Sequence, residues 1–371
     1  MIVLKKKVLV LHPPMYPVNY KFYDLLGKHV NLTVIQLGEH PVHHTSWNIN
    51  NYDRTNISFK IHVIGKGAVS LKDQLNLSYL KILYKTKPDI VLSIAFWFPS
   101  FILSISRLLF NFKFIILTNV IDETEIDSPP FIKIFRKIIS MNTDVFISAS
   151  KKTSSHINRN YRNSKIALST QTIDVSSWID EYYEMDPKSK LRESLMIPKD
   201  KIIMLGVGNF TEKKNWDIVF RSIDKSDQIH FLLIGSGALE SQYSNMVSKL
   251  MLKVDVTILP KQNQSEIKKY YKASDFLVFP SNFDQFGYVV PEALSFKLPV
   301  LCSKNTGASI LIRNGYNGYL IDPNHNIKKY MSKLVLDLTK MQTNSQESIR
   351  NLTLENRVLE FYEIFKRELD D

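Results

Sequence analysis

The sequence predicts an α/β protein built from two doubly wound, mainly parallel sheets. Short apolar segments alternate with amphipathic ones along the chain, its 371 residues exceed what one core usually serves, and a polar stretch interrupts the alternation near the middle. Seven apolar segments before the interruption are expected strands: 7–11, 32–37, 61–64, 90–94, 114–118, 145–148 and 166–168. Six further strands are expected after it: 202–207, 230–234, 255–259, 276–279, 299–302 and 318–321.

The polar stretch 176–198 marks the expected domain boundary, because it contains two prolines and many charges. We therefore assign an N-terminal Rossmann-like domain to residues 1–180 and a C-terminal one to residues 181–345. Apolar residues recur at helical spacing between 349 and 365, so residues 346–371 are expected to form a terminal amphipathic helix.

Cysteine content and charge exclude several classes of protein. The single cysteine, Cys302, rules out an internal disulfide or a multi-cysteine zinc site, and a reducing cytoplasm fits best. The net charge of +12 favours an anionic partner such as nucleic acid, a phosphorylated substrate or an anionic membrane surface. No basic run with interleaved aromatic residues indicates nucleic-acid binding, and residues 1–11 lack the apolar region of a signal peptide.

The apolar region 90–117 resembles a membrane span in hydropathy but is interrupted by Pro99, Arg107 and Lys113. We interpret it as strand, helix and strand, with the helix over 98–110. A membrane-surface role for that aromatic helix is an open alternative.

Glycines indicate which half binds the ligand, because eight of the 12 lie after the boundary and several follow a predicted strand. Backbone amides can approach phosphate oxygens closely at such positions. The loop 208–215 joins strand 202–207 to an expected helix over 216–223, and Lys214 near that helix is suited to a diphosphate. A solvated surface lysine is the alternative, and Lys213 is adjacent.

A second loop carries two carboxylates at another strand-to-helix junction. Strand 276–279 leads into 280–294, where Asp284 and Glu292 flank Phe286 and Gly287. Carboxylates accept hydrogen bonds from two hydroxyl groups well, which suits a sugar or ribose. A helix-start carboxylate favoured by the helix dipole is the alternative for Glu292.

These motifs make the second half resemble the donor-binding domain of GT-B glycosyltransferases, most closely the retaining family GT4, called glycosyl transferases group 1. The family's glutamate, seven residues, glutamate pattern falls on Asp284 and Glu292, and its Gly-Arg-x-x-x-x-Lys-Gly loop falls on residues 208–215. The resemblance implies two Rossmann-like domains facing a cleft, with the C-terminal helix crossing back to the first domain.

The resemblance also implies roles for individual residues. Glu292 would accept hydrogen bonds from the ribose, Lys214 would hold the diphosphate, and Asp284 would face the transferred sugar as a catalytic residue. The full set of donor-binding residues implied by the family is Gly208, Asn209, Lys214, Asp284, Phe286, Gly287, Glu292, Thr306 and Gly307.

Three positions depart from the family pattern. Asn209 stands in place of an arginine, Asp284 is one methylene shorter than the usual glutamate, and Ile310 replaces a frequent glutamate. A degenerate, noncatalytic GT-B partner protein therefore stays open as an alternative, as does a sugar-nucleotide epimerase.

The first half is expected to bind the acceptor. His12 follows the first strand and Asp122 begins an acidic turn after the fifth, so both are our further catalytic candidates, with His156 a weaker one. Ordinary packing for His12 and a solvated loop for Asp122 are the alternatives.

The function that this predicts is retaining transfer of a hexose or HexNAc from a nucleotide sugar, with UDP expected, to a saccharide or polyprenyl-linked acceptor. The context that we expect is synthesis of a bacterial surface polysaccharide such as O-antigen, capsule or lipopolysaccharide. No Asp-x-Asp triplet occurs, so we expect neither metal nor cofactor. We expect a cytoplasmic protein, peripheral on the inner face of the cell membrane, that does not bind nucleic acid.

Overall fold

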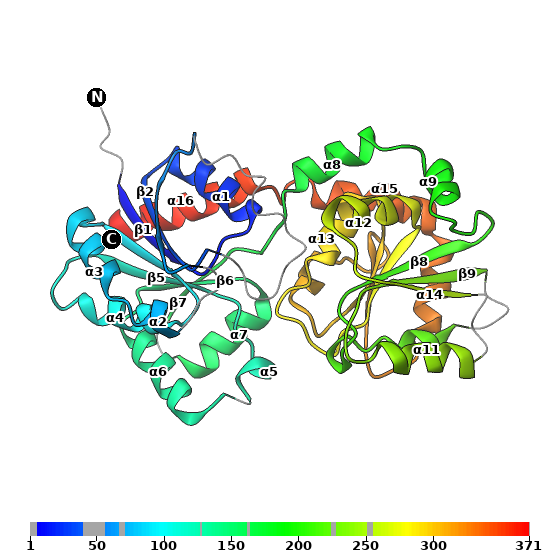
Figure 1. Ribbon diagram of the computed structural model, residues 1–371, viewed down its shortest axis with the longest axis horizontal. Helices are drawn as coiled ribbons and strands as arrows, with labels where there is room; N and C mark the ends of the chain where they lie inside the picture. The colour runs from blue at the N-terminus through cyan, green and yellow to red at the C-terminus, as the bar shows by residue number, and fades with distance from the viewer. Residues whose placement is uncertain are drawn as a thin grey trace. The chain divides into compact units, whose positions relative to one another are not determined.

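The computed structural model divides the chain into two compact units (Figure 1). It describes residues 6–39, 56–66, 71–126, 128–161, 164–223, 228–250 and 255–370. Unit 1 comprises Met1–Gln171 together with Leu354–Asp371, and unit 2 comprises Thr172–Thr353.

Unit 1 contains a seven-stranded parallel sheet with the order β3-β2-β1-β4-β5-β6-β7. Its strands are β1 Lys7–His12, β2 Asn31–Leu37, β3 Lys60–Ile64, β4 Ile90–Ile94, β5 Lys113–Thr118, β6 Val145–Ser148 and β7 Lys165–Leu168. Its helices are α1 Pro17–Gly27, α2 Leu71–Gln74, α3 Ser78–Thr86, α4 Phe98–Ser106, α5 Asp122–Glu125, α6 Pro130–Met141, α7 Lys151–Asn160 and α16 Leu354–Asp370. One apolar core lies between the sheet and α1 and α16, and the other lies beneath α3, α4, α6 and α7.

Unit 2 contains a six-stranded parallel sheet with the order β10-β9-β8-β11-β12-β13. Its strands are β8 Ile202–Val207, β9 Ile229–Ile234, β10 Val256–Leu259, β11 Phe276–Phe279, β12 Val300–Ser303 and β13 Gly318–Ile321. Its helices are α8 Val175–Glu184, α9 Lys188–Ser194, α10 Asp217–Ser222, α11 Glu240–Lys249, α12 Gln264–Ala273, α13 Val289–Ser295, α14 Lys328–Leu336 and α15 Leu338–Ile349, with 3-10 turns at Glu212–Lys214 and Gly307–Leu311. Apolar cores fill both faces of this sheet as well.

The predicted fold class is confirmed, since both sheets are parallel and each predicted strand lies within a residue or two of an observed one. The polar stretch 176–198 is not a linker, because α8 and α9 form there and bury Trp178 and Leu191 in the core of unit 2. Charged residues alternate with the apolar ones in both helices, so the charges concealed the helices in the sequence. The division between the units consequently falls at residue 171, whereas the sequence suggested residue 180.

The terminal helix is shorter than expected. Residues 346–349 belong to α15 in unit 2, and α16 begins only at Leu354, after the turn around Leu352. The helix expected over 98–110 likewise ends at Ser106, where the Ser106 hydroxyl donates to the Ile102 carbonyl oxygen. None of the helices formed by the described residues has the length and apolar character needed to cross a bilayer.

Aromatic packing fixes α16 on unit 1. The Phe361 ring lies 5.1 Å from that of Phe22 on α1 in an edge-to-face arrangement, and both rings are buried. The Ser169 hydroxyl donates to a Glu360 carboxylate oxygen at 2.8 Å. The last helix therefore belongs to the first core although unit 2 separates the two segments in sequence.

This packing predicts that Phe361→Ala lowers the free energy of unfolding by about 3–5 kcal/mol, because it removes a large buried side chain and leaves a cavity. Guanidinium unfolding followed by circular dichroism measures the change. The exposed Leu359 on the same helix gives the control, and Leu359→Ala should change stability by no more than about 0.5 kcal/mol. Equal effects of the two substitutions would contradict the packing.

Candidate functional site

The order of the strands in unit 2 determines where its functional loops meet. The order in which strands are added to the sheet reverses between β8 and β11, which are parallel, hydrogen-bonded neighbours. In open parallel sheets the carboxyl ends of the strands at such a reversal form a crevice that binds ligands. The two loops singled out in the sequence follow these two strands.

Contacts within unit 2 hold the loop after β8 in one conformation. Asn215 has a left-handed backbone (φ 57°), and its side-chain amide donates to the Pro323 carbonyl oxygen at 2.8 Å. Trp216 is fully buried, and its indole N–H donates to the Asn209 carbonyl oxygen at 3.2 Å. These contacts fix the 3-10 turn that presents Lys214, whereas the Asn209 side chain is exposed.

Lys214 and Asp284 form an ion pair between the two loops. The Lys214 Nζ lies 2.7 Å from Asp284 Oδ2, and Lys213 Nζ lies 3.8 Å from the same oxygen. The ammonium group of Lys214 also lies 5.0 Å from the centre of the Phe279 ring at the end of β11. Lys214 is thus the lysine placed at the junction of the loops, and Lys213 points more to solvent.

Backbone contacts bring a third loop to Asp284. The Gly307 N–H donates to the Asp284 carbonyl oxygen at 3.0 Å, and a Cβ on Gly307 would lie 2.2 Å from the Gln285 carbonyl oxygen. Only glycine permits this approach. Thr306 is fully buried beside Gly307, so its side chain supports the loop. The loops after β8, β11 and β12 therefore form one continuous structure.

Both the backbone conformation and the surroundings of Gly287 require glycine. Its φ is +104°, and a Cβ would lie 2.4 Å from the Phe279 ring. The neighbouring Phe286 is buried, and its N–H donates to Asp284 Oδ1 at 3.3 Å. The segment between the two carboxylates is thereby fixed in shape.

Glu292 lies on α13 and is held by a residue that the sequence did not indicate. The hydroxyl of the buried Tyr271 on α12 donates to Glu292 Oε2 at 2.7 Å. Burial raises the pKa of Glu292 to about 7, although the Tyr271 hydrogen bond and the Lys268 charge act in the opposite direction. Tyr271 resembles any other core aromatic in the sequence, so only the tertiary contact reveals it.

Two sequence-predicted residues of unit 1 lie at its own carboxyl edge. His12 ends β1, and the strand order of that parallel sheet also reverses between β1 and β4. Burial lowers the pKa of His12 to about 4, and its Nδ1 lies 2.5 Å from the Pro13 carbonyl oxygen, to which it donates. His12 is therefore neutral at physiological pH.

Asp122 begins α5, and its carboxylate contacts the side chains of His156 and Arg159. His156 Nδ1 lies 2.6 Å from Asp122 Oδ1, and Arg159 pairs with the other oxygen. Burial works against it, but these two partners hold the pKa of Asp122 below its usual value. The structure thus joins Asp122 to His156, while Asp127, the last residue of the acidic turn 122–127, lies outside the described residues.

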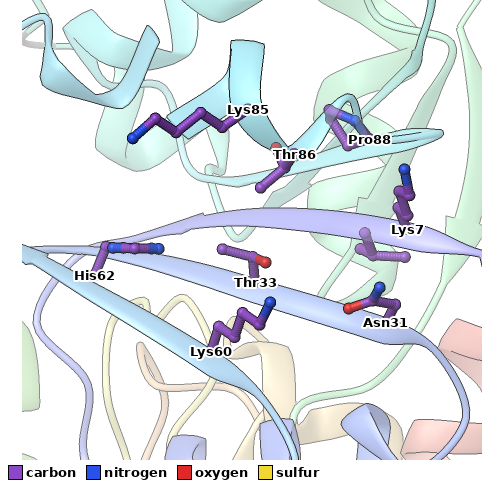
Figure 2. Close-up of a pocket in the computed structure, with 9 residues that line it drawn as sticks. Lys7, Asn31, Thr33, Lys60, His62, Lys85, Thr86 and Pro88 are labelled. Atoms are coloured by element: carbon purple, nitrogen blue, oxygen red, sulfur yellow. The ribbon is translucent and has the colours of Figure 1, made fainter. Parts of the chain in front are cut away.

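A cavity of about 410 Å³ lies at the opposite edge of the unit 1 sheet, away from His12 and Asp122. Figure 2 shows Lys60 and Thr33 on the strands, with Lys85 and Thr86 from α3 across from them. This amino-terminal edge contains no residue that the sequence assigned to a site.

Comparison with known proteins identifies a family for part of unit 2. Residues 187–351 match the family model for glycosyl transferases group 1. An uncharacterised glycosyltransferase of Methanocaldococcus jannaschii is 26% identical over 242 residues, which are 64% of this chain and 63% of that protein. A second glycosyltransferase of that archaeon is 28% identical over 153 residues, 40% of this chain and 39% of its own length.

Solved structures match the chain over almost its whole length. Anabaena HepE in complex with UDP has a TM-score of 0.76, with 16% identity, over 97% of this chain and 100% of that one. The lipopolysaccharide outer core galactosyltransferase WaaB has a TM-score of 0.73, with 14% identity, over 97% of this chain and 99% of that one. At these identities the likeness concerns the fold.

The protein therefore has the GT-B fold of these solved glycosyltransferase structures. Residues 187–351 match the glycosyl transferases group 1 family, and the chain spans 63% of the length of the first archaeal relative.

The environment of Glu292 predicts a pH effect on stability. Its pKa is raised from 4.5 to about 7, so the folded protein retains a proton that the unfolded chain loses between those pH values. The free energy of unfolding should therefore fall as the pH rises from about 4.5 to about 7 and receive no further contribution from Glu292 above that.

Glu292→Gln should remove this contribution, which thermal unfolding of both proteins between pH 5 and pH 8.5 measures. Glu347→Gln, on the exposed part of α15, is the matched control and should follow the wild type. Parallel pH profiles for the wild type and Glu292→Gln would show that Glu292 is ionised at low pH in the folded protein.

Proposed function

We propose that this protein is a retaining glycosyltransferase of family GT4 that uses a nucleotide sugar as donor. The observation that carries the proposal is the meeting of Lys214 and Asp284 at the β8–β11 reversal, in a family-matched unit. Cation, carboxylate and glycine-lined loops are what a nucleoside diphosphate sugar requires from a protein.

Transfer breaks the bond between the anomeric carbon and the diphosphate oxygen, and the electron pair leaves on the diphosphate. Lys214 stabilises that developing charge, because its ammonium group is fixed at the junction of the loops. A bound diphosphate competes with Asp284 for Lys214 and so frees the Asp284 carboxylate for the hydroxyl groups of the sugar. The acceptor hydroxyl attacks on the same face, and its proton passes to the departing phosphate.

Glu292 accepts hydrogen bonds from the ribose of the donor in this proposal. Tyr271 leaves one carboxylate oxygen of Glu292 for the ligand, since its hydroxyl occupies the other. UDP is the nucleotide that we propose, supported by the UDP complex of HepE, which has the same fold. We propose that no metal takes part, because the sequence lacks Asp-x-Asp and Lys214 supplies a cation.

Unit 1 binds the acceptor in this proposal, with His12 and Asp122 as its catalytic candidates. We propose a hexose or HexNAc as the transferred sugar and a saccharide or polyprenyl-linked acceptor. The context is bacterial surface polysaccharide synthesis at the inner face of the cell membrane, supported by the likeness of fold to the galactosyltransferase WaaB.

Binding of nucleoside diphosphates tests the proposal. UDP, GDP, ADP and dTDP are compared by thermal shift, each with and without magnesium. A nucleotide at about 100 times its dissociation constant stabilises by about 2.7 kcal/mol, so the shift is measurable. We expect a shift with UDP that is independent of magnesium and is lost in Glu292→Ala but retained in Glu347→Ala.

Two results would redirect the assignment. No shift with any nucleotide would favour a noncatalytic GT-B partner protein, for which Asn209 and Ile310 would be marks of a lost site. Interconversion of the sugar in the absence of an acceptor would indicate an epimerase.

A further inference from the structure

Helix α6 exposes a continuous apolar stripe on unit 1. Phe131, Ile134, Ile138 and Met141 recur at spacings of three and four residues and are 67%, 62%, 39% and 79% exposed. Residues at these spacings lie along one side of a helix. Ile139, on the other side, is fully buried against the sheet, so α6 is both packed and apolar toward solvent.

Lysines border this stripe, and acidic residues are absent from it. Lys133 and Lys137 are exposed one turn apart beside the apolar residues. The sequence contains no aspartate or glutamate from Ser128 to Thr143. The nearest carboxylate of α5, Glu125, is already paired with Arg136. The stripe therefore combines apolar surface with uncompensated positive charge.

The end of α4 extends the stripe. The rings of Phe101 and Phe135 stack with their centres 4.7 Å apart, so the two helices are in direct contact (Figure 1). Arg107 Nη1 donates to the Asn142 carbonyl oxygen at 2.6 Å, which joins the carboxyl ends of α4 and α6. Leu108 and Leu109 follow Arg107 and are 86% and 84% exposed. We call Leu108, Leu109, Phe131, Ile134, Ile138 and Met141 the α4–α6 surface.

Further cations lie beyond α4. The exposed Tyr84 on α3 has its ring centre 6.5 Å from that of Phe110, and the next residue, Lys85, lines the cavity shown in Figure 2. Lys7 and Lys60 line the same cavity, whose lining residues include no carboxylate. Positive charge thus continues past the apolar residues.

We propose that the α4–α6 surface docks this protein on an anionic lipid bilayer. Helix α6 lies in the plane of the membrane, with its apolar stripe among the upper acyl chains and Lys133 and Lys137 at the phosphates. Its 12 residues are too few to span a bilayer, whereas that length suits a helix at the interface. The inference rests on the proposed membrane location and names the surface responsible.

Charge argues against a second copy of the chain as the occupant. A two-fold dimer would place the same surface against itself, so Lys133 and Lys137 of both copies would approach each other. No carboxylate in residues 128–143 could compensate them. Anionic lipid headgroups supply the missing negative charge.

Co-sedimentation of the full chain with vesicles tests the proposal. We expect binding to phosphatidylglycerol-containing vesicles, weak binding to pure phosphatidylcholine vesicles, and weakening by salt. Phe131→Ser with Ile134→Ser should lower the partition coefficient at least about tenfold, because both side chains are exposed and their loss leaves the core intact. Lys133→Glu with Lys137→Glu should lower it to a similar extent.

Matched substitutions elsewhere are the controls. Met196→Ser with Leu336→Ser removes two exposed apolar side chains of unit 2, and Lys329→Glu with Lys333→Glu reverses two exposed charges on α14. Both should bind vesicles as the wild type does. Circular dichroism and the thermal midpoint verify folding, and a retained UDP shift in the α6 variants separates this proposal from the donor site.

Two results would overturn the inference. Equal binding by the wild type and the α6 variants, or no binding of the wild type to anionic vesicles, would exclude this surface as a membrane contact. Light scattering that shows a dimer for the wild type and a monomer for Phe131→Ser with Ile134→Ser would assign the surface to a second copy.

Discussion

The reversal of strand order between β8 and β11 is the constraint on which the candidate site depends. Parallel strands end at one edge of a sheet, and at a reversal the following loops diverge to opposite faces and leave a crevice between them. Lys214 and Asp284 are 70 residues apart in sequence, and their 2.7 Å contact exists because their strands are neighbours. Gly307 adds the loop of the next strand through its bond to the Asp284 carbonyl oxygen.

This arrangement pairs the opposite charges of Lys214 and Asp284 with each other in a mostly buried position. Lys214 and Asp284 are mostly buried and neutralise each other, so neither pays the cost of an isolated buried charge. A diphosphate can replace one partner of the pair without leaving Lys214 uncompensated. Glu292 has a different environment, since burial keeps its pKa near 7 and the Tyr271 hydroxyl fixes the orientation of its carboxylate. In the function proposed above, Lys214 receives the anionic end of the ligand and Glu292 its hydroxyl-bearing end.

Strands, loops and charged motifs were predictable from sequence because they depend on local pattern. Every predicted strand exists, and Asp284 and Glu292 lie, as expected, at one strand-to-helix junction. Tyr271, the helices over 176–198 and the exposed stripe of α6 were not predicted. Each depends on which side of a helix meets the core, and Ile134 and Ile139 are indistinguishable until the fold places one outside and the other inside. The position of Asp122 beside His156 is likewise a tertiary fact.

Calorimetric titration of UDP and of uridine into matched variants tests most directly whether Lys214 and Glu292 belong to one nucleotide site. Uridine has the ribose but lacks the diphosphate. Lys214→Ala should weaken UDP about tenfold or more and leave uridine unchanged, Glu292→Gln should weaken both, and Lys329→Ala, on exposed α14, should affect neither. If Lys214→Ala left UDP affinity unchanged, or Glu292→Gln weakened neither ligand, the assignment of the diphosphate and ribose contacts would be wrong.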